Sequence, residues 1–120
     1  MSVCIELMDF KGLMSHGLIS HVHRAIGLDT SQGMVDVYNQ KAKDNQLSSK
    51  MHALCIDLLS LPESEIPQEV QNVDMVVCAM SFHHISDIKK ATKGLASLLK
   101  KGGHLLVLDL QEGERFWISA

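Results

Sequence analysis

Short apolar runs alternate with amphipathic segments along most of the chain. The runs favour strands, and they lie at residues 3–10, 25–28, 51–56, 73–80 and 104–110. Between them, apolar residues recur at helical spacing within residues 13–22, 34–42 and 88–99. Nearly continuous apolar strands that alternate with helices are typical of a parallel sheet buried on both faces. The pattern therefore predicts an α/β fold, a doubly wound parallel sheet with helices on both faces.

Polar residues and glycines mark where the predicted helices begin and end. Ser31 can cap the second helix, because its hydroxyl oxygen can accept a backbone N–H of the first turn. Ser86 and Asp87 suit the start of the third helix, and Gly102 is predicted to end it. The two prolines predict an irregular or short helical connection before the fourth strand, since proline disfavours helix at the preceding residue.

The length of 120 residues suits one domain. We assign residues 1–110 to this domain, truncated after the fifth strand, and residues 111–120, which show no decisive period, to a C-terminal tail. A net charge of −3 leaves no excess positive field for binding phosphates, so nucleic acid is not an expected partner. No apolar run approaches the length of a membrane span, so we expect no membrane association.

The cysteines and the first residues of the chain bear on its location. Cys4, Cys55 and Cys78 lie in apolar, strand-like contexts and form no Cys-x-x-Cys pair, so we expect buried thiols in a reducing compartment. Residues 1–9 carry acids where a signal peptide would be apolar. Both observations predict a cytoplasmic protein.

Two of the predicted strands lead directly into an acid. Asp29 follows the second strand, at the carboxyl edge of the sheet, where an acid can accept both hydroxyls of a ribose. The alternative role for Asp29 is to help cap the helix that begins near Ser31. Asp57 follows the third strand in the same way, and its alternative is a solvated loop acid. Asp74 opens the fourth strand on the opposite edge of the sheet, so we interpret it as structural.

Two adjacent histidines follow the fourth strand. His83 and His84 lie in a predicted loop, where a histidine can accept a proton near neutral pH. The alternative is that these histidines cap or pack the loop. A metal site built from them with His21 and His23 would lack a ligand set of known spacing, so no metal is expected.

Taken together, these segments resemble the class I S-adenosylmethionine-dependent methyltransferase family. The resemblance is carried by residues 26–31, 55–59, 73–85 and 98–109, and it spans residues 5–110. It implies a Rossmann-like sheet with strand order 3-2-1-4-5 and S-adenosyl-L-methionine as the cofactor. It also implies an enzyme that transfers a methyl group to an O, N or C nucleophile of a small molecule.

The same resemblance implies roles for individual residues. Asp29 would bind the ribose, with the adjacent Thr30 in the same site. Met34 would edge the adenine pocket, and Asp57 or the backbone of Leu58 would recognise the adenine amino group. The small Ala79, with Met80, would lie beneath the cofactor. The remaining expected site residues are the proton acceptors His83 and His84 and the residues that flank the turn after the first strand, Asp9 and Gly12.

The turn after the first strand departs from the family pattern, which is of the type Asp-x-Gly-x-Gly-x-Gly. Here Asp9 and Phe10 match the end of the strand and Gly12 matches the start of the helix, so Lys11 stands in place of the intervening glycines. A residue with a Cβ is strained where φ must be positive. We therefore expect weak binding of S-adenosylmethionine and little turnover.

Two further hypotheses compete with an active methyltransferase. The chain could be a catalytically inactive, methyltransferase-like remnant that acts as a binding or interaction module, with the exposed sheet edge as the place for a protein partner. A nicotinamide-dependent oxidoreductase ranks third. An acid after the second strand suits a ribose equally well, but the chain has no Gly-x-Gly-x-x-Gly motif.

Overall fold

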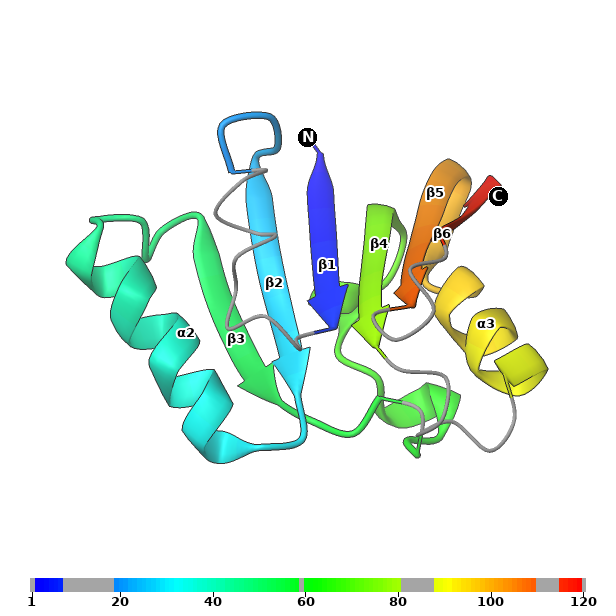
Figure 1. Cartoon of the computed structure of the whole chain (residues 1–120), viewed down its shortest axis with the longest axis horizontal. Helices are drawn as coiled ribbons and strands as arrows, with labels where there is room; N and C mark the ends of the chain where they lie inside the picture. The colour runs from blue at the N-terminus through cyan, green and yellow to red at the C-terminus, as the bar shows by residue number, and fades with distance from the viewer. Residues whose placement is uncertain (1, 8–18, 59, 81–87, 110–114, 120) are drawn as a thin grey trace.

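The computed structural model describes residues 2–7, 19–58, 60–80, 88–109 and 115–119. Figure 1 shows one twisted sheet with α2 beside β3 at one end and α3 near β5 at the other. In chain order the elements are β1 (Val3–Leu7), β2 (Arg24–Asp29), α2 (Gln32–Asp44), β3 (Met51–Cys55), the 3-10 helices η1 (Glu63–Glu65) and η2 (Gln68–Val70), β4 (Val73–Met80), α3 (Ile88–Ala96), β5 (Leu99–Asp109) and β6 (Arg115–Ser119).

The strands form one sheet in the order β3-β2-β1-β4-β5-β6. The first five strands pair in parallel, so the predicted order and direction are confirmed. The sixth strand was not predicted: residues 111–120, expected to be a tail, contain β6, which pairs antiparallel with β5 and sets Trp117 opposite Leu106. A strand of five residues is too short to show a decisive period, and here its partner in the sheet defines it.

One predicted helix boundary is confirmed and another is wrong. Ser31 caps α2 as predicted, and its Oγ accepts the backbone N–H of Met34 at 3.3 Å. Gly102 does not end α3, because the helix already ends at Ala96 and Leu99 pairs with Val73 in the sheet. Residues 19–22, the described end of the first predicted helix, form a turn and a bend. Ser86 and Asp87 lie outside the described residues.

Two apolar clusters bury the two faces of the sheet. They take alternate residues of β2, since Ala25 belongs to one cluster and Ile26 to the other. Helix α2 covers the face of Ala25 with three buried side chains: Val35, Tyr38 and Ala42. Helix α3 and the connection between β3 and β4 cover the opposite face, through the buried Leu95 and Val70. Helices on both faces were predicted, and these clusters show why the strands read as nearly continuous apolar runs.

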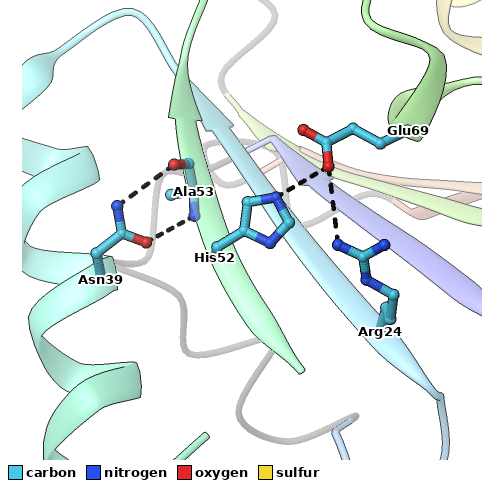
Figure 2. A network of polar contacts seen from close by, with 5 residues as sticks. All are labelled: Arg24, Asn39, His52, Ala53 and Glu69. Atoms are coloured by element: carbon cyan, nitrogen blue, oxygen red, sulfur yellow. Dashed lines mark hydrogen bonds and ion pairs between the residues drawn. The ribbon is translucent and has the colours of Figure 1, made fainter. Parts of the chain in front are cut away.

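Side-chain contacts fix α2 to β3, and they fix η2 to β3 and β2 (Figure 2). The Ala53 N–H of β3 donates to Asn39 Oδ1 at 2.8 Å, and Asn39 Nδ2 donates to the Ala53 carbonyl at 3.3 Å. Glu69 of η2 lies 3.2 Å from His52 Nε2 and 3.7 Å from the guanidinium of Arg24. At Ala53, therefore, the outer edge of the sheet is already paired with a side chain of α2.

Asp74 joins three strands at the amino edge of the sheet. Its Oδ2 accepts the backbone N–H of Val3 at 2.8 Å, and its carboxylate forms an ion pair with Lys100. Burial acts to raise the pKa of Asp74, but the hydrogen bonds from Lys100 and Val3 and the charge of Lys100 outweigh it and hold the pKa below its usual value. The structural role expected for Asp74 is confirmed.

The cysteines differ in their exposure. Cys4 and Cys78 are buried as expected, and burial, followed by the nearby charge of Glu6, raises the pKa of Cys4 to about 12. Cys55 is exposed, which corrects the expectation for this residue. The reason is its position as the last residue of β3, which lies at the end of the sheet. No helix among the described residues is long and apolar enough to span a membrane.

Candidate functional site

The candidate site lies at the edge of the sheet where the parallel strands end. The five parallel strands run in the same direction, so their carboxyl ends face one side of the molecule (Figure 1). Asp29 is the last residue of β2, and Asp57 lies two residues beyond the end of β3. Ala79 and Met80 are the last two residues of β4. In doubly wound sheets this edge is the one that binds ligands.

The loop from β2 into α2 orients the carboxylate of Asp29. This side chain is partly buried, and its Oδ1 accepts the backbone N–H of Ser31 at 2.8 Å. The capping role considered for Asp29 is therefore present. An ionised carboxylate has about four acceptor positions, so the bond from Ser31 leaves acceptor capacity for a ligand hydroxyl. The capping role and a ribose-binding role are compatible.

Direct contacts fix the ends of β2 and β3 relative to each other. Cys55 stands opposite Asp29 in the parallel register, and the N–H of Ile56 donates to the Asp29 carbonyl at 3.0 Å. The Cys55 thiol donates to the carbonyl of the exposed Thr30 at 3.5 Å. These contacts hold the backbone at Asp29 and the loop that begins at Ile56 as neighbours.

The loop after β3 presents Asp57 and buries Leu58. Asp57 is exposed, and its Oδ2 accepts the hydroxyl of Ser60 at 2.6 Å, while the Ser60 N–H donates to the Asp57 carbonyl. The Leu58 side chain packs into the core with 7% of its surface exposed. Leu58 therefore anchors the loop through its side chain, and only its backbone is suited to contact a ligand.

The structure describes three of the remaining expected site residues, Met34, Ala79 and Met80, and not the other four. Met34 is half-buried and packs against the cluster beneath α2. The backbone of Ala79 and Met80 pairs with β5 opposite Leu108 and Asp109. Asp9, Gly12, His83 and His84 lie outside the described residues. Within the part of the chain that the structure describes, no three His, Cys, Asp or Glu side chains are grouped to hold a metal ion.

The sequence interpretation missed one acid, Glu6. This residue lies in β1 between Gly27 of β2 and Val77 of β4, and its side chain is only 1% exposed. It precedes Leu7, which pairs with Leu28, one position before Asp29. An acid inside an apolar strand was the available signal, but Asp9 and Phe10 were matched to the end of the strand from the sequence.

Comparisons with known proteins agree with this architecture. A family model described as a methyltransferase domain matches residues 10–107. An uncharacterised methyltransferase of Schizosaccharomyces pombe is 36% identical over 116 residues, which cover 91% of this chain and 40% of that protein. A demethylmenaquinone methyltransferase of Bacteroides fragilis is 31% identical over 116 residues, which cover 97% of this chain and 44% of that protein. The chain thus spans less than half the length of these relatives.

A solved structure supports the fold. The crystal structure of a putative S-adenosyl-L-methionine-dependent methyltransferase from Methanococcus maripaludis superposes with a TM-score of 0.73 at 20% identity. The match covers 90% of this chain and 48% of that one. At this identity, the similarity shows that the two chains share a fold.

Proposed function

We propose, because the chain belongs to the class I S-adenosylmethionine-dependent methyltransferase family, that it forms the cofactor-binding part of a small-molecule methyltransferase. The methyl group would pass from the sulfonium of S-adenosyl-L-methionine to an O, N or C nucleophile of the acceptor. The family match over residues 10–107 supports this proposal. The small-molecule acceptor is proposed by analogy with the Bacteroides fragilis relative, whose name specifies demethylmenaquinone.

One observation carries the proposal: two carboxylates from adjacent parallel strands stand at the same edge, and each is already oriented by a neighbouring serine. Ser31 orients Asp29, and Ser60 orients Asp57. Carboxylate oxygens are acceptors, so they suit the hydroxyls of a ribose and the amino group of an adenine. This donor and acceptor chemistry fits the adenosine part of the proposed cofactor.

We assign the residues around the cofactor as follows. Asp29 would accept the ribose hydroxyls, with Thr30 beside it, and Met34 would edge the adenine pocket from α2. Asp57 and the backbone of Leu58 would recognise the adenine amino group. Ala79 and Met80 would lie beneath the cofactor, and Asp9 and Gly12 would flank its methionine end.

The residues of this chain would mainly bind and orient. The bound cofactor supplies a methyl group on a sulfonium, which is a good leaving group. Positioning the acceptor in line with that methyl group and excluding water therefore provide much of the acceleration. The acceptor must also lose a proton when the new bond forms. We propose His83 or His84 as the base that takes it.

Calorimetric titration with S-adenosylhomocysteine tests the assignment of Asp29. Asp29→Asn keeps an oxygen that can accept the Ser31 N–H but removes the charge, so the fold should be preserved while the ribose loses charge-assisted bonds. We expect the affinity to fall roughly tenfold, equivalent to about 1.4 kcal/mol. Asp36→Asn on the exposed side of α2 is the matched control and should bind like the parent. Equal affinities for the Asp29 variant and the parent would remove Asp29 from the site.

A further inference from the structure

We propose that Asn39 is a positioning residue for the ligand site and that it acts through the carboxylate of Asp29. This inference rests on the proposed function, because its readout is the affinity for the cofactor product at the same edge of the sheet. Three observations lead to it: the two hydrogen bonds between Asn39 and Ala53, the bonds that join the start of α2 to Asp29, and the contact that returns from Asp29 to β3.

The side-chain amide of Asn39 holds α2 against the outer strand β3 (Figure 2). Its Oδ1 accepts the Ala53 N–H at 2.8 Å and its Nδ2 donates to the Ala53 carbonyl at 3.3 Å, so it takes both polar backbone groups of one residue. The neighbouring Tyr38 packs on the sheet through apolar contacts, which have no preferred direction, whereas a hydrogen bond weakens steeply away from its preferred angle. The two bonds of Asn39 therefore fix where α2 lies along β3.

The first turn of α2 carries this constraint to the candidate site. Ser31 caps the helix, since its Oγ accepts the Met34 N–H at 3.3 Å, and the N–H of the same Ser31 donates to Asp29 Oδ1 at 2.8 Å. From position 31 to position 39 the helix rises about 12 Å, at about 1.5 Å per residue. A helix moves nearly as a rigid element over this length, so a shift at Asn39 also moves Ser31. The donor that orients the Asp29 carboxylate is therefore positioned by α2.

The backbone of Asp29 is held by β3 directly. Cys55 stands opposite Asp29 in the parallel register, and the Ile56 N–H donates to the Asp29 carbonyl at 3.0 Å. The contacts thus form a closed path, which runs from β3 through Asn39, α2 and Ser31 to Asp29 and back to β3. Without the bonds of Asn39, α2 can move relative to β3 while the Asp29 backbone stays in register. We expect such a movement to turn the carboxylate.

The competing explanation is that Asn39 only stabilises the fold. In that case its removal would lower the folded fraction and so weaken the binding of any ligand, whatever residue stands at position 29. A positioning role predicts a different pattern, because Asn39 would then matter only through the bonds that the Asp29 carboxylate makes. Two residues that act through one contact have effects that are not additive. The two explanations therefore differ in what removing Asn39 does once the Asp29 charge is gone.

A double-mutant cycle separates the two explanations. S-adenosylhomocysteine is titrated calorimetrically into the parent, Asn39→Ala, Asp29→Asn and the double variant, at a temperature where circular dichroism shows each protein to be folded. We expect Asn39→Ala to lower the affinity about threefold to tenfold in the parent and less than about twofold in the Asp29→Asn background. Asp74→Ala, which removes a hydrogen bond and an ion pair at the amino edge of the sheet, is the control for lost stability and should bind like the parent.

The outcomes separate this inference from the proposed function. If Asp29→Asn weakens binding and Asn39→Ala does not, or if Asn39→Ala weakens it equally in both backgrounds, the inference is wrong and the proposed site stands. If the parent does not bind S-adenosylhomocysteine, or binds it no more tightly than Asp29→Asn, both are wrong. Should Asn39→Ala not fold, Asn39→Asp takes its place in the cycle. It keeps an oxygen for the Ala53 N–H, lacks the donor for the Ala53 carbonyl, and should show a loss of affinity that disappears in the Asp29→Asn background.

Discussion

Removing the carboxylate of Asp74 should destabilise the fold in a manner that depends on pH. Asp74 accepts the Val3 N–H at 2.8 Å, and a hydrogen bond to a charged acceptor contributes about 2 kcal/mol. The ion pair adds less, up to about 1 kcal/mol, because the Lys100 side chain is 49% exposed. For Asp74→Ala we therefore expect a loss of about 2 to 3 kcal/mol in the free energy of unfolding near neutral pH.

The sign of the pH dependence follows from the lowered pKa of Asp74. A carboxyl group with a lower pKa in the folded state stabilises the fold above its unfolded pKa of about 4. That contribution is lost as the pH falls through the lower, folded pKa. The difference between parent and Asp74→Ala should thus be largest near pH 7 and should shrink in strong acid.

Urea unfolding of both proteins, followed by circular dichroism at several pH values, measures this difference. Asp74→Asn should lie between the parent and Asp74→Ala at neutral pH, because its carboxamide oxygen can still accept the Val3 N–H. Asp36→Ala, which removes an exposed acid of α2, should change stability by about 0.5 kcal/mol or less. A difference for Asp74→Ala that stays constant from pH 7 into strong acid would refute the assigned role of the charge.

Two further predictions concern the β3 side of the sheet. Asn39→Ala should cost about 1 to 3 kcal/mol, because it leaves both polar groups of Ala53 without their side-chain partner, and the Ala53 amide should exchange faster with deuterium. Asn45→Ala, which removes a side-chain bond to the exposed end of α2, is the control and should leave that exchange rate unchanged. Cys55 should react with a maleimide in the folded protein, while the two buried cysteines react only on unfolding, as counted by mass spectrometry. A ligand bound at the proposed site should slow the reaction of Cys55, and labelling of all three cysteines at one rate would contradict the burial pattern.

The sequence predicted the sheet well because its information is repeated along the chain. Each parallel strand contains a short apolar run, and a polar residue such as Ser31 marks the start of a helix. The errors fall where a tertiary contact decides the outcome. Leu99 fits a helical stripe and a buried strand equally well, and its pairing with Val73 selects the strand. Cys55 has an apolar neighbourhood in the sequence, but β3 is an outer strand and its last residue is exposed.

The two ends of the candidate site also differ in how far the sequence specifies them. Asp29 ends β2, Asp57 lies two residues beyond β3, and each accepts a hydrogen bond from a serine within three residues, so local sequence was sufficient to predict that both stand at the carboxyl edge. The acid of β1 required the register. Glu6 lies within the sheet, buried between Gly27 and Val77, and Asp9 lies outside the described residues. An acid that a local motif orients can therefore be found from the sequence, whereas an acid buried in the middle of the sheet is found only from the pairing of its strand with both neighbouring strands.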